Sequence, residues 1–316
     1  MEKRKLGKTS LEIPAIVFGG NVFGWTVDQS ESFKLLDAWG AAGFNFIDTA
    51  ASYSSWVPGN KGGESETIIG NWMKVRGNRN RMLIATKVAS EMGPGRKGLS
   101  KKYILEAVND SLIRLQTDYI DLYQAHWPDD NIPHEESLEA FNQLMQEGKI
   151  RAFGCSNFSA SQLLASSEAA KKANLIAYQT LQPLYNLYDR AIFENELRDI
   201  CLEENTGVIN YYSLASGFLT CKYRQESDFA NSSRGAGARK YFTERGLRIV
   251  AELESVAAEY HSKPSTVAIA WLLNKPGVTA PIASARTIEQ LTELTQASTL
   301  MLSPQALNSL DSASIY

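Results

Sequence analysis

The sequence predicts a (β/α)8 TIM barrel, an α/β fold in which eight parallel strands alternate with helices. Eight short runs rich in β-forming residues recur along the chain, with helical patterns between them. They are, in order, AIVFGG from 15, FNFIDTA from 44, RMLIATKV from 81, YIDLYQAH from 119, RAFGCSN from 151, IAYQTLQP from 176, GVINYYS from 207 and APIASA from 280. Strands that alternate with helices form βαβ units and a parallel sheet, and eight such units close into a barrel. The 316 residues fit one domain of this kind, residues 1–316.

A doubly wound sheet is the alternative architecture for the same alternation of strands and helices. A Rossmann dinucleotide site would need a G-x-G-x-x-G turn after the first strand. The run AIVFGG is not followed by such a turn. The barrel is therefore favoured.

The two ends of the chain carry elements outside the eight repeating units. Before the first strand, two short runs flank Gly7-Lys8-Thr9 and predict a hairpin that closes the N-terminal end of the barrel. Near the other end, Ser303 followed by Pro304 predicts the capped start of an extra C-terminal helix on the outside of the barrel.

Helical spacing is visible between the strands. The stretch 99–116 carries one apolar face, formed by Ile104, Val108, Leu112 and Leu115. In the first helix the same spacing joins Leu35, Trp39 and Ala42, and Gly43 is placed to end the helix. The seventh and eighth strands are unusually far apart. The surplus, 213–242, is rich in Gly, Ser and basic residues, and it predicts a lid or binding loop at the end of strand seven.

Bulk composition excludes several classes of partner. Net charge is −3, so the chain has no global attraction to nucleic acid or to an anionic membrane. No apolar stretch approaches the ~20 residues of a membrane helix, and no apolar run follows the basic N-terminus, so a cytoplasmic protein is predicted. The spacing of Cys155, Cys201 and Cys221 does not resemble a metal site, so reduced thiols and no metal are expected.

Four titratable residues, Asp48, Tyr53, Lys87 and His126, lie at or just past the ends of predicted strands. In a barrel the carboxyl ends of the strands meet at one rim, so these side chains could form one proton-transfer site. A lysine that ends an apolar strand is costly to bury without a partner, and Asp48 on the neighbouring strand is that partner. A nearby cation lowers the pKa of a phenol, which makes Tyr53 a candidate general acid. With an imidazole to hydrogen-bond a carbonyl oxygen, the site suits hydride addition to a carbonyl.

Several segments resemble the signature sequences of one enzyme family. They are GFNFIDTAASYSS with GESETIIGNWM, then ATKV, IDLYQAHWPD, GKIRAFGCSNFS, AYQTLQPLYN, YYSLASGFLT and PIASARTIEQL. Because these segments occur in the family's order over nearly the full length, the chain resembles the aldo-keto reductase superfamily. The resemblance implies that Tyr53 donates a proton, Lys87 lowers the pKa of Tyr53, Asp48 holds Lys87, and His126 orients the carbonyl.

The resemblance also implies a site for a nicotinamide cofactor. Ser156, Asn157 and Gln179 would hydrogen-bond the carboxamide. Tyr211, chosen over Tyr212 because GFLT fixes the register, would stack under the nicotinamide ring.

Farther along the cofactor, the implied contacts move to backbone groups and a cation. Leu214, Ser216 and Gly217 would follow the pyrophosphate, Arg286 would meet the 2′-phosphate, and Gln290 would lie near the adenine. An arginine binds phosphate bidentately, which favours NADPH over NADH.

Some cofactor-site positions depart from the family pattern. Ser213 stands where proline is common, and Cys221 and Ser284 stand where glycine is common. Ser284 still falls within the implied cofactor site. Lys222 could also reach phosphate, although a solvated basic face would explain the same residue.

The substrate side of the site is predicted from three tryptophans. Trp25, Trp56 and Trp127 follow strands one, two and four, so they could line the mouth, although loop packing is an equal alternative. An aromatic wall suits aldehydes and ketones with apolar bodies.

The leading hypothesis is an NADPH-dependent carbonyl reductase that acts on a small-molecule substrate. One alternative is a barrel lyase in which Lys87 forms a Schiff base with its substrate. Another is a cofactor-binding regulatory subunit with little turnover, because some relatives that resemble this chain are channel-associated subunits.

Overall fold

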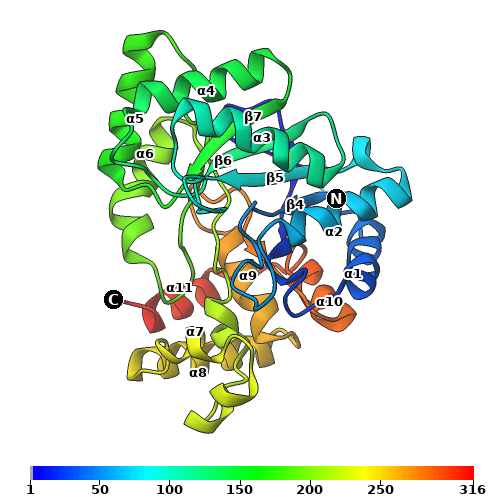
Figure 1. Cartoon of the computed structure of the whole chain (residues 1–316). Coiled ribbons are helices and arrows are strands. Elements are labelled where there is room, and N and C mark those ends of the chain that lie inside the picture. The colour runs from blue at the N-terminus through cyan, green and yellow to red at the C-terminus, as the bar shows by residue number, and fades with distance from the viewer. Residues whose placement is uncertain (1–2) are drawn as a thin grey trace.

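A computed structural model describes residues 3–316 and has eight parallel strands in one curled sheet (Figure 1). Met1 and Glu2 of the predicted domain lie outside the described residues. The strands follow the order β10-β3-β4-β5-β6-β7-β8-β9. Their bounds are β3 Val17–Gly19, β4 Phe46–Asp48, β5 Leu83–Val88, β6 Ile120–Ala125, β7 Ile150–Ser156, β8 Thr180–Gln182, β9 Gly207–Val208 and β10 Ile282–Ala283. Each predicted run coincides with one of these strands, with β7 starting one residue before its run, so the eight predicted strands are confirmed.

Backbone hydrogen bonds join the two edge strands and close the sheet into the predicted (β/α)8 barrel. The amides of Thr279 and Ala280 donate to Val208 O at 2.9 and 3.1 Å, and the amide of Ile282 donates to Asn210 O at 2.9 Å. All neighbouring strands run parallel, so their carboxyl ends share one rim.

Helices follow most of the strands and surround the barrel. The longer ones are α1 Gln29–Ala41, α2 Glu64–Arg76, α3 Lys101–Leu115, α4 His134–Gln146, α5 Ala160–Ala173, α6 Arg198–Glu203, α8 Glu244–Glu259, α9 Pro264–Leu273 and α10 Ile288–Gln296. In α3 the predicted apolar face is buried at Ile104, Val108 and Leu115. In α1, Leu35 and Trp39 are buried as predicted.

The prediction for Ala42 was wrong. Helix α1 ends at Ala41, so Ala42 lies outside the helix and is exposed. The chain turns there because Gly43, with φ of +87°, follows directly.

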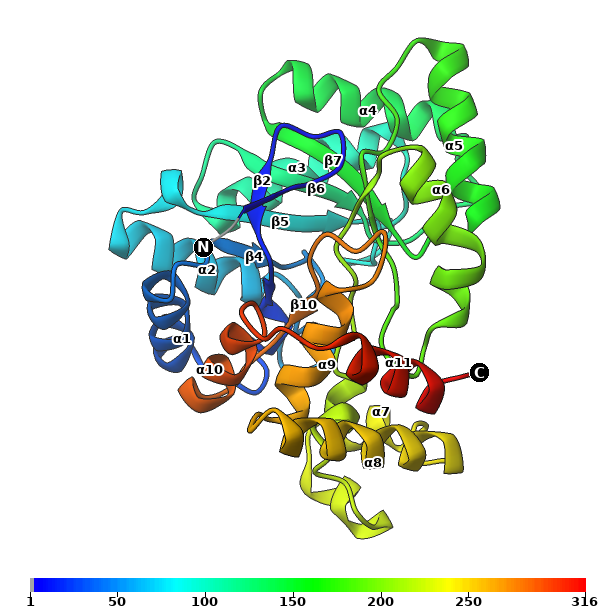
Figure 2. The same cartoon turned by 180° about the vertical axis from the view of Figure 1, so that it is seen from behind.

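The predicted N-terminal hairpin is present and covers one end of the barrel (Figure 2). Strands β1 Lys3–Lys5 and β2 Glu12–Pro14 pair antiparallel. Leu6 and Leu11, between the two strands, and Ile13, within β2, are buried in one cluster with inward-facing strand residues such as Phe46 and Leu122. Gly7 has φ of +53°, and a Cβ there would stand 2.2 Å from the Gly207 amide nitrogen. The hairpin therefore needs glycine at position 7 to seat on the barrel.

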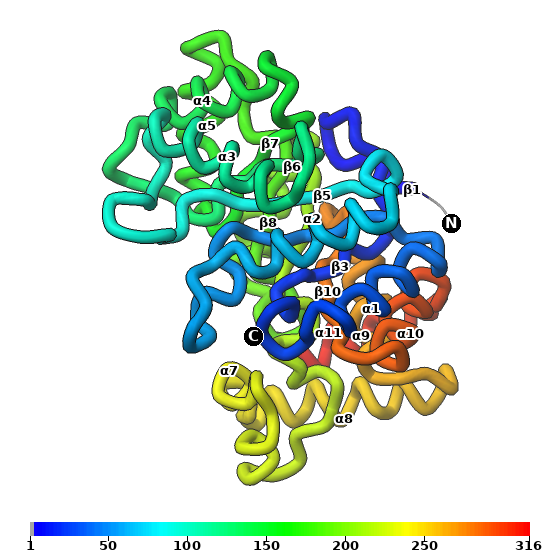
Figure 3. The backbone as a smooth tube through the Cα atoms, turned by 45° about the vertical axis from the view of Figure 1, so that its right-hand side comes forward, coloured from blue at the N-terminus to red at the C-terminus, as the bar shows by residue number. Residues whose placement is uncertain are grey.

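The surplus segment 213–242 is folded into short helices at the carboxyl rim. They are η4 Ala215–Thr220, η5 Glu226–Asn231 and α7 Gly235–Arg239. They lie beside α8, at the opposite end of the molecule from α3 and α4 (Figures 1 and 3). The predicted C-terminal helix is α11 Pro304–Ala313, and the Ser303 hydroxyl accepts a hydrogen bond from the Ala306 amide. Across residues 3–316, no helix combines the length and the apolar character that crossing a membrane requires.

Candidate active site

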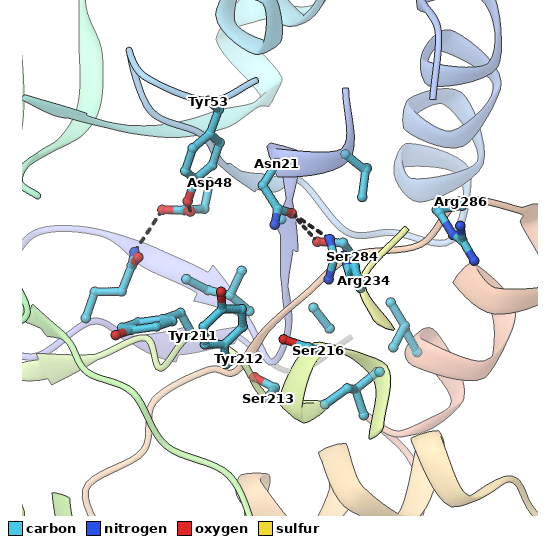
Figure 4. A pocket seen from close by; sticks show the side chains of 18 of the residues that line it. Asn21, Asp48, Tyr53, Tyr211, Tyr212, Ser213, Ser216, Arg234, Ser284 and Arg286 are labelled. Carbon is cyan, nitrogen blue, oxygen red and sulfur yellow. Dashed lines mark hydrogen bonds between the residues drawn. The ribbon is translucent and has the colours of Figure 1, made fainter. Parts of the chain in front are cut away.

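A cavity of about 630 Å³ opens at the rim where the strands end (Figure 4). Its walls come from the ends of the strands, from the loops that follow them and from the surplus segment. Asp48, Tyr53 and His126 line it, and Lys87 lies behind this wall, with its side chain fully buried. The structure therefore brings the four strand-end residues together.

Lys87 is the centre of the hydrogen bonds at this end of the cavity. Its Nζ donates to Asp48 Oδ2 at 2.6 Å, to Thr49 O at 2.7 Å and to Tyr53 Oη at 2.9 Å. An ammonium has three donors, so all of them are used. The side chain is held in one position with its charge directed at the carboxylate and the phenol.

Asp48 is held in turn by two buried amides. Its Oδ1 accepts hydrogen bonds from Gln182 Nε2 at 2.9 Å and from Gln124 Nε2 at 3.4 Å. The Tyr53 hydroxyl lies 3.3 Å from Asp48 Oδ2. Sequence reasoning missed both glutamines, although each lies on a predicted strand with its side chain inside the barrel.

The pKa of Tyr53 is shifted in the direction opposite to the prediction. Burial raises the pKa of its phenol well above the ordinary value, and the charge of Asp48 and its hydrogen bond act in the same direction. The prediction considered only the charge of Lys87, whereas burial and Asp48 both raise the pKa of the phenol. Burial also lowers the pKa of Lys87, and Asp48 opposes that shift. Tyr53 is therefore a protonated phenol at neutral pH, which is the form that can donate a proton.

His126 presents a neutral imidazole to the cavity. Burial, together with the charge of Lys87, lowers its pKa to about 3. Its Nδ1 lies 3.1 Å from the Ser90 hydroxyl, which leaves Nε2 free for another partner. The ring centroids of Tyr53 and His126 are 6.0 Å apart, so both groups can meet one substrate oxygen.

The residues predicted to hold the nicotinamide are connected to one another, with one exception. Tyr211 Oη donates to Asn157 Oδ1 at 2.7 Å, and Asn157 Nδ2 donates to Ser156 Oγ at 3.1 Å. All three line the cavity.

Gln179 is the exception, and that prediction was wrong. It precedes β8, on the side away from the cavity, and its Oε1 accepts a hydrogen bond from the Phe153 amide. Gln182, at the carboxyl end of the same strand, lines the cavity instead. Pro183 could have identified it, because a proline ends the strand directly after Gln182 and barrel sites form at that end.

The segment after β9 follows the cavity in a run of left-handed residues. Ala215, Ser216 and Gly217 have φ of +48°, +57° and +85°. Leu214, Ser216 and Gly217 line the cavity as predicted. Cys221, which stands where the family pattern has glycine, also has a positive φ of +60°, so the backbone keeps the glycine conformation despite the side chain.

Three cations meet at the far end of the cavity. Lys222, Arg234 and Arg286 all line it, and within residues 3–316 no ion pair joins any of them to a carboxylate. Burial lowers the pKa of Lys222, with Arg286 and Arg234 acting in the same direction. Unpaired cations this close repel one another, and an anionic phosphate group would compensate them. Arg234 was missed because it lies in the surplus segment, whose irregular structure the sequence did not specify.

The remaining predicted cofactor residues lie beside these cations. Ser284 Oγ donates to Asn21 Oδ1 at 2.7 Å, and Arg234 donates to the same oxygen at 3.3 Å. Gln290 Oε1 accepts a hydrogen bond from the Arg286 amide at 2.9 Å. Ser284 and Gln290 both line the cavity, so the cation end is shaped by groups from several loops.

Two of the three tryptophans lie where they were predicted. Trp56 and Trp127 line the cavity and are 50% and 49% exposed. Trp25 does not line it, so that prediction was wrong. Its ring packs edge-on against Trp56 with centroids 5.6 Å apart, and the Arg234 guanidinium lies 5.6 Å above it. Trp25 supports the wall from behind.

The amino-acid sequence is similar to those of known proteins over nearly its full length. The family model described as "Aldo/keto reductase family" matches residues 15–315. Similar chains include "Aldo-keto reductase YhdN" of Bacillus subtilis, 33% identical over 94% of this chain and 88% of the relative. "Uncharacterized oxidoreductase YrpG" of the same organism is 32% identical over 98% and 95%. "Probable voltage-gated potassium channel subunit beta" of rice is 32% identical over 98% and 96%.

Proposed function

Because the chain belongs to the aldo/keto reductase family, an oxidoreductase family that uses a nicotinamide cofactor, we propose that it reduces aldehydes or ketones to alcohols with NADPH. The observation that carries this proposal is the contact of a protonated, buried phenol with a fully hydrogen-bonded Lys87–Asp48 pair on the cavity wall. The other end of the same cavity holds three cations that no carboxylate of residues 3–316 pairs with.

The residues at the strand ends divide the work of carbonyl reduction. When bound in the cavity, NADPH would supply the hydride for the carbonyl carbon. Tyr53 donates its proton to the oxygen that becomes negative, and Lys87, 2.9 Å away, stabilises the phenolate that remains. Asp48 keeps Lys87 charged and in position. The neutral His126 donates a hydrogen bond that orients the carbonyl oxygen.

The cations support NADPH as the cofactor. The dinucleotide carries a pyrophosphate and a 2′-phosphate, and Lys222, Arg234 and Arg286 form a matching positive end. Arg286, on the loop before α10, is assigned to the 2′-phosphate because its planar guanidinium binds phosphate bidentately. NADH lacks that phosphate, so it should bind more weakly.

The geometry argues against a Schiff-base lyase. A lysine that attacks a carbonyl needs a free, uncharged amine with access to the substrate. The side chain of Lys87 is fully buried and spends all three donors on Asp48, Thr49 and Tyr53.

A second candidate function rests on the names of several relatives. Those of rice, fission yeast and Arabidopsis thaliana are named as potassium channel beta subunits, at 32–34% identity over 93–98% of this chain. A cofactor-binding regulatory subunit with little turnover would keep the same cavity and the same cations.

Oxidation of NADPH in the presence of a panel of aldehydes and ketones tests the proposal. Turnover that is faster with NADPH than with NADH is the expected result. Tight NADPH binding without turnover on any substrate would favour the regulatory subunit, and absence of binding to either nucleotide would overturn both candidates. Borohydride trapping of substrate on Lys87 would revive the lyase.

A further inference from the structure

The loop that follows β5 begins with a strained residue, Ala89. Its φ is +101°, a conformation that residues with a Cβ rarely adopt. Hydrogen bonds hold the backbone on both sides of this residue. The His126 amide donates to Val88 O at 2.8 Å, and the Gly98 amide donates to the carbonyl of the strained residue at 2.9 Å. Such strain persists only where the surrounding structure holds it, and it clusters at functional sites.

The residue directly after the strained position, Ser90, meets the ring of His126. Ser90 lines the cavity, and its Oγ lies 3.1 Å from His126 Nδ1. Among residues 3–316, no other group is hydrogen-bonded to this hydroxyl. The ring nitrogen is therefore the acceptor that the described chain offers to the hydroxyl proton.

Other contacts fix the place of the His126 ring. It stacks on the Trp127 ring, with centroids 5.6 Å apart and an angle of 16° between the planes. The His126 carbonyl accepts a hydrogen bond from Asn157 Nδ2 at 2.9 Å. Packing and backbone contacts thus set where the ring lies, so the contact with Ser90 bears on where the ring carries its proton.

A neutral imidazole has two tautomers, and only one of them suits carbonyl reduction. Burial and the charge of Lys87 lower the pKa of His126 to about 3, so the ring carries one proton at neutral pH. With that proton on Nε2, the ring can donate to a carbonyl oxygen while Nδ1 accepts from a hydroxyl. With the proton on Nδ1, a lone pair on Nε2 would face the carbonyl oxygen and repel it. A hydroxyl that donates to Nδ1 selects the first tautomer.

We propose that Ser90 is a positioning residue whose hydroxyl donates to His126 Nδ1 and holds the ring proton on Nε2, ready for the substrate oxygen. The use of Nε2 rests on the proposed function, whereas the tautomer itself exists without turnover. Ser90 acts through His126 and does not touch the reacting atoms. The strain at Ala89 has a use in this arrangement, because it places the hydroxyl within reach of the ring.

Nuclear magnetic resonance of the full chain with ¹⁵N-labelled histidine tests the tautomer directly. The chain has three histidines, and the signals of His126 are identified by their loss in His126→Gln. At pH 7, its Nε2 should resonate as a protonated nitrogen and its Nδ1 as an unprotonated, hydrogen-bonded one. In Ser90→Ala, both signals should move toward the average of the two tautomers. A protonated Nδ1 in the parent protein, or unchanged signals in Ser90→Ala, would overturn the proposal.

Two control variants show whether the hydroxyl itself is responsible. Ser90→Thr keeps a hydroxyl at the same position and should give the parent signals. Ser55→Ala removes an exposed hydroxyl from the loop after β4, at the same rim but outside the cavity lining, and should change nothing. Signals in Ser90→Thr that match those of Ser90→Ala would contradict the role of the hydroxyl.

A kinetic cycle tests whether Ser90 acts only through His126. On a carbonyl substrate that the parent reduces, Ser90→Ala should lower kcat about 3- to 10-fold, the worth of about one hydrogen bond. Affinity for NADP⁺, measured by calorimetry, should change by less than about twofold. In the His126→Gln background, the same loss of the hydroxyl should lower kcat by less than about twofold, because no imidazole remains to be oriented. Equal losses in both backgrounds would contradict a role exerted through His126.

The possible outcomes separate this inference from the proposed function. A parent protein that reduces carbonyls while His126 carries its proton on Nδ1 would overturn the role of Ser90 and leave the reductase proposal intact. A parent protein without turnover, in which Ser90→Ala still shifts the His126 signals, would keep the Ser90–His126 assignment and overturn the reductase proposal.

Discussion

The two ends of the cavity handle charge in opposite ways. At the catalytic end, Lys87 and Asp48 neutralise each other across 2.6 Å, and their remaining hydrogen-bonding groups are engaged by the protein. At the other end, Lys222, Arg234 and Arg286 face the cavity with no carboxylate paired to them in the described chain. The first end is organised by the protein itself, whereas the positive charge of the second end is not compensated within residues 3–316.

This difference follows from the elements that carry each end. Asp48 and Lys87 lie on neighbouring parallel strands, whose pairing fixes their separation. Lys222 and Arg234 lie on the surplus segment, which consists of short helices and turns. Strands hold reacting groups to fixed positions, whereas a loop can bring charges to a ligand.

The largest effect should separate chemistry from binding at the catalytic end. Tyr53→Phe removes the proton donor, so kcat should fall by about 10²- to 10⁴-fold. Affinity for NADP⁺, measured by calorimetry, should change by less than about twofold, because the cations remain. Turnover near the parent rate in this variant would contradict the role of Tyr53.

The next effect tests the internal pairing of the catalytic end. Asp48→Asn leaves Lys87 buried beside a neutral amide, and the free energy of unfolding should fall by about 3–5 kcal/mol in urea denaturation. The control is Asp199→Asn, which breaks an exposed pair with Arg198 and should change the free energy of unfolding far less. Similar losses of unfolding free energy in both variants would contradict the expectation that the buried Lys87–Asp48 pair stabilises the fold more than an exposed pair does.

A smaller effect tests the cation end. Arg286→Ala should weaken NADPH binding about 10- to 100-fold and change NADH binding little, because a charge-assisted contact to the 2′-phosphate is lost. The thermal midpoint of the unliganded protein should stay the same or rise, since one of three repelling charges is gone. Arg224→Ala is the matched control, because Arg224 pairs with Glu254 and does not line the cavity. Equal losses for NADPH and NADH would remove the 2′-phosphate assignment.

The smallest effect is a pH dependence at the catalytic end. The folded pKa of His126 is about 3, below its unfolded value of about 6.5, so the unfolded chain binds a proton first as pH falls. Its stabilising contribution is present above pH 6.5 and is lost toward pH 3, by about 2 kcal/mol between pH 7 and pH 5. Urea unfolding at the two pH values should show a smaller difference in His126→Gln than in the parent. The control is His261→Gln, which removes an exposed histidine and should leave the difference in unfolding free energy between the two pH values as in the parent. If His126→Gln also kept the parent's difference, the pKa of His126 would not be lowered in the folded protein.

Strand-borne features were predictable from the sequence. Short β-forming runs located all eight strands, and the residues at their ends located Asp48, Lys87 and His126. The prediction depended only on local patterns, because parallel pairing brings strand ends to one rim. Gln179 shows the limit of predicting site residues from local patterns. It precedes β8, whereas the glutamine that lines the cavity is Gln182, three residues later at the carboxyl end of that strand.

Features that depend on several surrounding groups could not be predicted in this way. The pKa of Tyr53 is raised by burial and by the charge of Asp48, whereas the sequence-based prediction considered only the effect of Lys87 on the phenol. Arg234 lies in the surplus segment, whose path depends on left-handed backbone at Ala215 and Ser216. Alanine and serine do not indicate such a conformation in a sequence, as glycine would. Trp25 lies behind Trp56 rather than beside it, which only the packing of two loops decides.

The seating of the N-terminal hairpin has a consequence for the order in which the protein is built. Gly7 packs on Gly207, and the Arg4 side chain donates a hydrogen bond to the carbonyl of Thr279, 275 residues later. These partners leave the ribosome long after the hairpin does. The hairpin is thus synthesised long before it can gain these contacts, and the end of the barrel that it covers is finished only after Thr279 has been made.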